Sequence, residues 1–266
     1  MPPFWHLAIE CSAAAGSVAL FENSPLEALP VLHGQTILPS DRGSVQTLAP
    51  AIDGLLRQAQ LRVGDLKFIS ATVGPGSFTG LRVGLATAKM LAMAGQISIA
   101  PVDTLAAIAR RFAIDQGAKL SEPVRLVTAI NAFRKQVFTA SWIIRGSSVS
   151  NIRSPSVVDL SEWRVDPWGA DVPRSPTSSD HENRATDATE IWLSGSALEL
   201  TPLTSDVAPT DVPASYQTAD ANIWQPLAEH VGVMGWENYL QGGAVSAGDL
   251  APNYIRASAA EEKIRA

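Results

Sequence analysis

The chain has 266 residues, of which 46% are hydrophobic, so it is long enough for one large or two smaller domains with a sizeable core. Its net charge of −6 disfavours a protein that grips a nucleic-acid backbone alone, because such proteins usually carry a basic stripe. The single cysteine excludes an internal disulfide, and no run of about 18 apolar residues is available to span a bilayer. The N-terminus lacks the features of a signal peptide, and we expect a cytoplasmic protein.

The first part of the chain alternates short apolar runs with turns. Residues 7–11 and 17–21 flank a turn of small residues and predict a β-hairpin, and residues 30–33 are compatible with a third strand. From Val45 onward, apolar residues recur at three- and four-residue spacing and predict a helix, with Pro50 in its first two turns. The apolar positions of this helix are Leu48, Ile52, Leu55, Leu56 and Ala59.

The most distinctive stretch runs from Gly74 to Gly84 and reads Gly-Pro-Gly-Ser-Phe-Thr-Gly-Leu-Arg-Val-Gly. A β-branched, apolar run at 68–73 precedes it and predicts a buried strand. A helical pattern without proline follows it. Ser77 or Thr79 is suited to cap that helix, because a side-chain oxygen there can accept from the free N–H groups of the first turn.

Small residues recur every four positions along this predicted helix. They form one smooth stripe, which lets another backbone approach closely. Two glycines inside a helix cost roughly 1 kcal/mol each relative to alanine, so we expect something to pack against the stripe. Its members are Gly80, Gly84, Ala88 and Ala92.

The glycine-rich turn also allows an anion-binding interpretation. A turn between a strand and a helix offers backbone N–H groups to a phosphate. No Lys-Ser/Thr pair follows at P-loop spacing, and the glycine spacing is one residue too long for the dinucleotide fingerprint. Helix packing is therefore favoured, and an anion site stays open at four residues, Gly74, Gly76, Ser77 and Thr79.

Other catalytic or metal-binding chemistry has little support in the sequence. The flanks of Ser77 lack the glycines of a hydrolase nucleophile elbow. Cys11 fits a small buried residue. Glu10, at the end of the first strand, could coordinate a phosphate-bound magnesium, but a lone acid at a turn is usually solvated. The histidines are scattered and form no metal-binding pair. We expect no catalytic residue, no metal and no cofactor.

The second part of the chain repeats the order of the first without close sequence similarity. A strand at 97–100 and a helix from 103–104 lead to a second predicted hairpin, with strands at 124–130 and 136–144 and a turn at 131–135. Two lobes of this kind predict an α/β fold with mixed sheets flanked by helices, divided as 1–104 and 105–266. Further expectations are a mobile insertion at 165–189, a strand at 191–196, a connector at 201–215 and a last helix at 220–240 that could pack back on the first lobe.

The Gly74–Gly84 motif, followed by Ala86-Thr87-Ala88-Lys89, resembles the signature of the TsaB (YeaZ) family. Three further segments resemble family features in the same order: residues 7–12, residues 48–56 and the C-terminal Pro252-Asn253-Tyr254-Ile255-Arg256. Asn131-Ala132-Phe133-Arg134 stands where the family commonly has Asp-Ala-Arg. The resemblance covers most of the first lobe and little of the second. Glu10-Cys11 replaces the usual Asp-Thr, and Ser44-Val45-Gln46 replaces His-Ser-Glu.

The resemblance implies a two-lobed actin/sugar-kinase-like fold and a role in forming N6-threonylcarbamoyladenosine in tRNA beside the anticodon. It implies a non-catalytic subunit that pairs with a TsaD-like transferase, works with a TsaE-like ATPase and meets tRNA indirectly. The implied partner surface lies on the helices at about 45–60 and 78–94. The residues carried over to it are Leu48, Ile52, Leu55, Gly80, Val83, Gly84, Thr87, Ala88 and Leu91.

Two alternatives stay open. Relatives of this fold include glycoprotease-like peptidases and nucleotide-binding phosphotransferases, and a fold does not settle a function. The missing histidine pair disfavours the metallopeptidase, and the incomplete phosphate motifs disfavour the kinase. A homodimer through the same two helices is also compatible with the stripe, because an exposed apolar surface tends to become covered.

Overall fold

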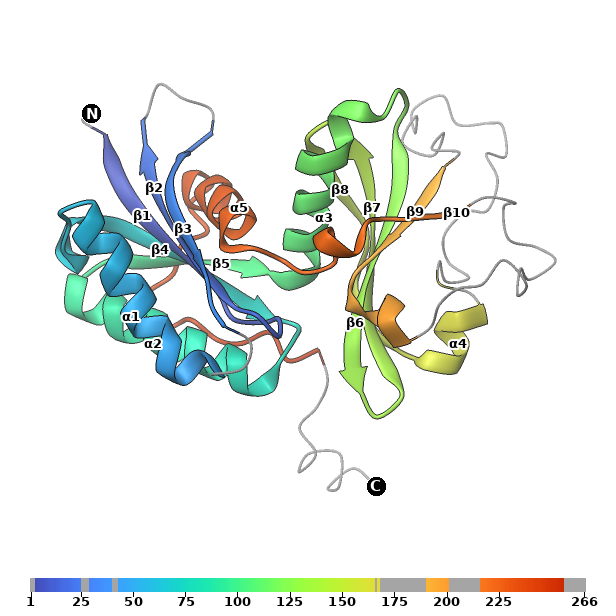
Figure 1. The fold of residues 1–266 in the computed structure, drawn as a ribbon, viewed down its shortest axis with the longest axis horizontal. Coiled ribbons are helices and arrows are strands. Elements are labelled where there is room, and N and C mark those ends of the chain that lie inside the picture. The colour runs from blue at the N-terminus through green and yellow to red at the C-terminus, as the bar shows by residue number, and fades with distance from the viewer. Residues whose placement is uncertain are drawn as a thin grey trace. The chain divides into compact units, whose positions relative to one another are not determined.

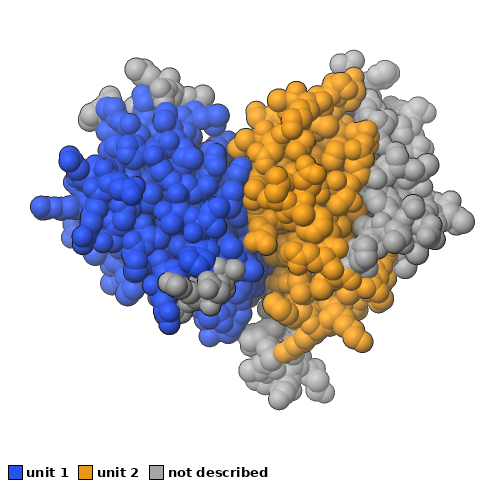
Figure 2. All heavy atoms as spheres, viewed as in Figure 1, with its two compact units in different colours: residues 1–107, 226–254 blue, residues 108–225, 255–266 orange. Residues whose placement is uncertain are grey.

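The computed structural model describes residues 3–24, 29–39, 43–165, 167, 190–200 and 216–255. The predicted connector at 201–215 lies outside these ranges, as does nearly all of the predicted insertion at 165–189. The chain forms two compact units, coloured separately in Figure 2. Unit 1 contains residues 1–107 and 226–254, and unit 2 contains residues 108–225 and 255–266.

Unit 1 is built on a five-stranded mixed sheet (Figure 1). The first two strands form the predicted antiparallel hairpin, with Glu10 opposite Ser17. The fourth strand, which leads into the glycine-rich motif, runs parallel to the first. In sheet order the strands are β3 (Val31–Ile37), β2 (Ser17–Asn23), β1 (Phe4–Glu10), β4 (Leu66–Gly74) and β5 (Ser98–Asp103).

Helices cover both faces of this sheet (Figure 1). Helices α1 (Gly43–Gln58) and α2 (Phe78–Gly95) pack on one face, where the predicted apolar positions of α1 join Leu7 and Ile9 in the core. Helix α5 (Ala228–Leu240) packs on the other face, against Ala8 and Phe21. Because both faces are covered, the central strands are apolar on both sides rather than alternating. Element η1 (Val63–Asp65) is a short 3-10 turn before β4.

Unit 2 contains a second five-stranded sheet with the same topology. In both sheets three consecutive strands pair antiparallel. A fourth strand then pairs in parallel with the first of the three, and a fifth pairs in parallel with the fourth. The second hairpin and the two-lobed mixed α/β architecture are therefore confirmed. In sheet order the strands are β10 (Tyr216–Thr218), β9 (Ile191–Ser194), β6 (Val124–Phe133), β7 (Gln136–Arg145) and β8 (Ser148–Asp159).

The helical elements outside the first sheet are mostly short. Helix α3 (Thr104–Gln116) follows β5, and its predicted apolar face is buried at Leu105, Ile108 and Phe112. The Asp103 carboxylate accepts a hydrogen bond from Ala106 N at 2.9 Å and so caps this helix. The remaining elements are α4 (Leu160–Val165), η2 (Gly117–Lys119), η4 (Ser196–Leu200) and η6 (Ala221–Ile223).

The structure differs from the sequence-based expectation in four elements. Strands β8 and β10 and helix α4 were not anticipated, since β8 is an exposed edge strand that contains Pro155 and lacks a clear apolar pattern. The last helix begins at Ala228 rather than at 220. Pro226 lies between the preceding 3-10 turn, η6, and α5. Proline disfavours a helical conformation in the residue before it, so η6 and α5 do not form one continuous helix.

The C-terminal part of the chain belongs to unit 1. Besides α5, the segment after it pairs with β5 through two hydrogen bonds between Ile99 and Val245, both 2.8 Å. Asn253 N donates to Val73 O at 2.7 Å, and Leu250 is buried in the core between α1, α2 and the sheet. The two compact units divide after Ala107, and residues 226–254, which include the last helix, belong to the first unit.

Candidate docking site and the glycine-rich turn

The glycine-rich turn packs tightly onto the turn between β1 and β2. Ser77 N donates to Ser12 O at 2.8 Å. A Cβ atom at Gly76 would lie 2.5 Å from the same Ser12 oxygen, so only glycine fits there. The Ser77 side chain accepts from Gly80 N at 3.2 Å, which confirms the predicted helix cap. The protein itself thus takes two of the N–H groups that the anion interpretation would direct at a phosphate.

The small-residue stripe of α2 faces the interior of unit 1. All four members of the stripe are buried. A Cβ at Gly80 would lie 2.1 Å from Cys11 O, and one at Gly84 would lie 2.9 Å from Cys11 Cβ. The expectation that another segment packs closely on the stripe is right, but that segment is the end of β1 in the same unit. Gly80, Gly84 and Ala88 are buried in unit 1, and their part in docking a second protein stays a prediction.

The other residues proposed for docking also lie on the inner side of the two helices. Leu48, Ile52 and Leu55 of α1 are at most 5% exposed and belong to the core, so any role in docking is to support the helix. Val83, Thr87 and Leu91 of α2 are half-buried, and α1 and α2 pack side by side. Leu48, Ile52 and Leu55 hold α1 on the core of unit 1.

The outer face of α2 carries apolar side chains that the sequence reasoning missed. Met90 and Met93 are 65% and 71% exposed, and Ala86 lies one turn before Met90 on the same face. On α1, which packs beside α2, the outer residues include Ala49, and Asp53 forms an ion pair with Arg57. The spacing of Ala86, Met90 and Met93 at four and three residues could have identified this face.

The two motifs that carry the family resemblance meet in space at the start of α2. The Phe78 ring lies 6.1 Å from the Tyr254 ring, and the Arg82 guanidinium lies 3.7 Å from the Phe78 centroid. Phe78 and Tyr254 are each 52% exposed. Tyr254 of the C-terminal motif therefore extends the surface that begins on α2, although the two residues are far apart in sequence.

Glu10 is buried at the end of β1, so the expectation of a solvated acid is wrong. Its Oε1 accepts hydrogen bonds from Ser12 N at 2.6 Å and Ser12 Oγ at 2.5 Å, and a longer one from Ala13 N at 3.3 Å. Burial raises the pKa of the Glu10 carboxyl to about 7, and these hydrogen bonds oppose that rise. The carboxyl group thus occupies the backbone N–H groups of the turn that an anion would otherwise use.

The described residues contain little that would serve catalysis. Nowhere within them do three or more His, Cys, Asp or Glu side chains gather closely enough to hold a metal ion. Asp103 is largely buried, and that burial raises the pKa of its carboxyl to about 6, but its oxygen is used to cap α3. Among the described helices, none is long and apolar enough to cross a membrane.

Comparison with known protein families identifies relatives of this chain. The model of the family TsaD: tRNA N6-adenosine threonylcarbamoyltransferase matches residues 36–264. The chain belongs to the TsaD family. Among curated members, a transferase from Streptococcus equi subsp. equi is 32% identical over 110 residues, which cover 38% of this chain and 32% of that protein.

Within the TsaD family, the TsaB (YeaZ) resemblance is confirmed. The tRNA threonylcarbamoyladenosine biosynthesis protein TsaB of Escherichia coli is 29% identical over 163 residues, or 57% of this chain and 63% of that protein. TsaB of Bacillus subtilis is 33% identical over 117 residues, or 43% of this chain and 47% of that protein. These alignments span about a third to just under two thirds of the curated relatives.

The fold of the family member YeaZ from Pseudomonas aeruginosa matches nearly the whole chain. The TM-score is 0.67 at 23% identity, and the match covers 94% of this chain and 99% of YeaZ. This likeness shows the fold alone. The two-lobed actin/sugar-kinase-like fold predicted from the sequence is confirmed.

Proposed function

We propose that this chain is a non-catalytic subunit that pairs with a TsaD-like transferase in the formation of N6-threonylcarbamoyladenosine in tRNA. The observation that carries the proposal is the match to the TsaD family over residues 36–264, joined to relatives named as threonylcarbamoyladenosine biosynthesis proteins. A TsaE-like ATPase completes the proposed assembly, and tRNA is the substrate of that assembly.

The partner surface in this proposal is the outer face of α2 with the adjoining face of α1. Met90 and Met93 are exposed apolar side chains on a regular helix, and methionine adapts to irregular partner surfaces. Exposed apolar side chains gathered on one face mark interaction sites in soluble proteins. The buried stripe supports this surface indirectly, because its tight packing on β1 fixes the orientation of α2.

The alternative of a nucleotide-binding phosphotransferase is weakened by Glu10. In a phosphate-binding turn, backbone N–H groups point at the anion. In this chain Ser12 N and Ala13 N donate to the Glu10 carboxyl group, and Ser77 N donates to Ser12 O. Tight, stoichiometric binding of ATP and magnesium to the isolated chain, measured by calorimetry, would favour the phosphotransferase instead.

Replacing exposed methionines tests the proposed pairing. Met90→Glu and Met93→Glu place charges on the outer face of α2 without touching the core. We expect at least a tenfold loss of affinity for a co-expressed TsaD-like subunit, because burying an unpaired carboxylate in an interface is costly. Affinity is measured by co-purification and calorimetry, and reconstituted tRNA modification should fall with it.

Leu240→Glu is the matched control for these two variants. Leu240 is an exposed apolar residue, 62% exposed, at the end of α5. The control should pair and support modification like the unaltered chain. Full pairing by the Met90→Glu and Met93→Glu variants would show that α2 is not the partner surface. If these variants instead only dissociate a homodimer of this chain, the face serves self-association.

A further inference from the structure

The turn between β6 and β7 has an unusual backbone conformation. Phe133, Arg134 and Lys135 have φ angles of 58°, 52° and 60°, so three consecutive non-glycine residues are left-handed. Hairpin turns of this kind normally carry Asn-Gly or Gly-Gly, because L-residues with side chains are strained there. These three side chains therefore destabilise the turn relative to glycine or asparagine, so the stability of the turn does not explain their presence.

Neighbouring groups hold the turn in place. The Asn131 side chain accepts a hydrogen bond from Phe133 N at 2.7 Å, and Lys135 O accepts one from Leu160 N at the start of α4 at 2.8 Å. The strained conformation is therefore fixed at both ends within unit 2. A turn that is held in this way presents its side chains in a defined arrangement.

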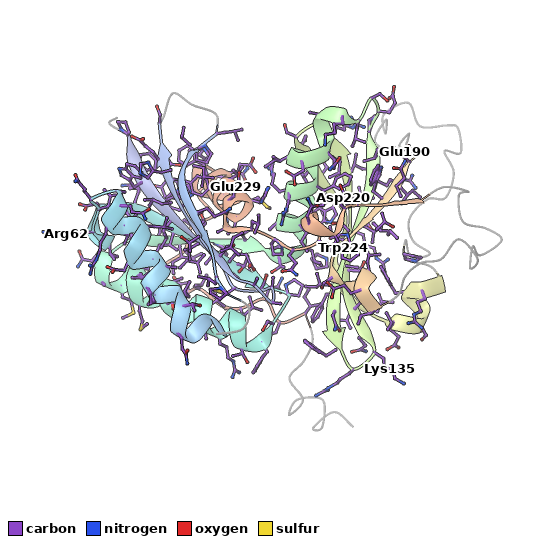
Figure 3. The ribbon with its side chains drawn as sticks, viewed as in Figure 1. Arg62, Lys135, Glu190, Asp220, Trp224 and Glu229 are labelled. Atoms are coloured by element: carbon purple, nitrogen blue, oxygen red, sulfur yellow. The ribbon has the colours of Figure 1, made fainter. Side chains whose placement is uncertain are left out.

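The tip presents an aromatic ring beside two cations. Phe133 is 65% exposed, and Arg134 and Lys135 are exposed. Figure 3 labels Lys135 at this end of the second sheet. Asp159 lies opposite Gln136 in the sheet and accepts a hydrogen bond from Gln136 Nε2 at 3.3 Å. The tip thus carries two cationic side chains beside the ring.

We propose that the tip formed by Phe133, Arg134 and Lys135 is an RNA contact that holds an unpaired base and its phosphates. This inference rests on the proposed function, in which the substrate is a tRNA. Unstacked bases in RNA loops stack on exposed aromatic side chains, and Lys and Arg contact the phosphates alongside. The alternative partner is an acidic protein. Such a partner would pair with the two cations, but its binding would not explain the exposed aromatic ring. Because the chain has a net charge of −6, this tip would be one contact within a larger RNA-binding surface formed by the assembly.

Arg134→Asn with Lys135→Gly tests the cations without weakening the turn. This double variant gives the turn the residues that its backbone prefers, so its melting temperature should stay the same or rise. Its affinity for an unmodified tRNA transcript should fall, and the slope of log K against log salt should become shallower by about one to two. Phe133→Ala should lower the affinity about tenfold through lost stacking. Both are measured by fluorescence anisotropy, on the isolated chain and on its complex with the TsaD-like subunit.

The matched control removes two cations elsewhere. Arg62→Asn with Lys67→Asn changes two exposed residues of unit 1 and should leave tRNA affinity nearly unchanged. Unaltered tRNA affinity of the Arg134→Asn/Lys135→Gly variant, in both the chain and the complex, overturns the inference. Lost binding to the protein partner with tRNA affinity intact also overturns it, in favour of an acidic protein. If the chain pairs with no TsaD-like subunit, the proposed function fails, and the isolated-chain assay still decides the RNA contact.

Discussion

Glu10 shows how one buried residue changes the interpretation of a neighbouring motif. The sequence places an acid at the end of a strand, next to small residues, where it would usually be solvated. In the structure its Oε1 accepts three hydrogen bonds within its own turn, and its Oε2 has no hydrogen-bond partner among the described residues. The glycine-rich turn then packs on Ser12. The segment from Glu10 to Ser12 therefore packs directly against the turn to which the anion interpretation assigned a ligand.

Glu10→Gln should stabilise the protein above neutral pH. The pKa of the folded Glu10 carboxyl, about 7, is above its reference value of 4.5, so the folded state holds its proton more tightly. This contribution is fully present below pH 4.5 and is lost as the pH rises through 7. Gln keeps an acceptor for Ser12 and cannot ionise. The free energy of unfolding of the variant should exceed that of the unaltered chain by on the order of 3 kcal/mol above pH 7 and match it near pH 4.5.

The measurement is denaturant unfolding at about pH 8 and about pH 4.5. At about pH 8, His6 does not contribute to the difference in stability. Burial lowers its pKa to about 3 in the folded chain, and at this pH its imidazole is neutral in the unfolded chain as well. Glu162→Gln, at an exposed position of α4, controls for the loss of a negative charge. An equal gain for Glu10→Gln at both pH values would show that ionisation of Glu10 is not the cause.

Helix α2 shows what the spacing of small residues can and cannot establish. The four-residue period correctly predicts a helix with a close neighbour. It does not say whether that neighbour is a second protein or the same chain. Here the neighbour is the end of β1, reached because β4 lies directly beside β1 in the sheet. The exposed face with Met90 and Met93 lies on the other side of the helix from the glycines, so the glycine spacing does not identify it.

Gly80→Ala should destabilise unit 1 even though alanine favours helices. The added Cβ would lie 2.1 Å from Cys11 O, which is backbone and cannot move aside easily. We expect a loss of about 1–3 kcal/mol in the free energy of unfolding, as for overpacking in a core. Thermal and denaturant unfolding measure the loss, and pairing with a TsaD-like subunit should weaken only as far as folding does.

Gly54→Ala is the matched control within α1. A Cβ at Gly54 meets no atom within 4 Å, so this change should stabilise the helix by roughly 0.5–1 kcal/mol. A stabilising Gly80→Ala would mean that the close contact between α2 and Cys11 does not exist in solution.

Across the whole molecule, local patterns predicted most elements and a last helix that could pack back on the first lobe, but not the contacts that hold it there. The hairpins, the parallel strands and the apolar helix faces follow from short-range periodicity. The return of α5 and residues 241–254 to the first unit depends on contacts between distant segments, such as Asn253 with Val73, which no local pattern reveals. Strand β8 escaped notice because an edge strand exposed along much of its length lacks the apolar alternation that identifies buried strands.

Truncation after Gln225 tests this organisation. It would remove α5 and the segment that pairs with Ile99 and Val73, and would uncover the face of the first sheet that contains Ala8 and Phe21. We expect unit 1 to lose its cooperative unfolding transition, because a sheet that is apolar on both faces needs cover on both. Circular dichroism during heating and limited proteolysis, with mass spectrometry to locate the cuts, provide the measurement.

Truncation after Ile255 is the control, since it keeps every contact described for α5 and for residues 241–254. If β1, β2 and β4 stay protected from protease in the shorter chain, then α5 and residues 241–254 dock on a first unit that is already folded without them.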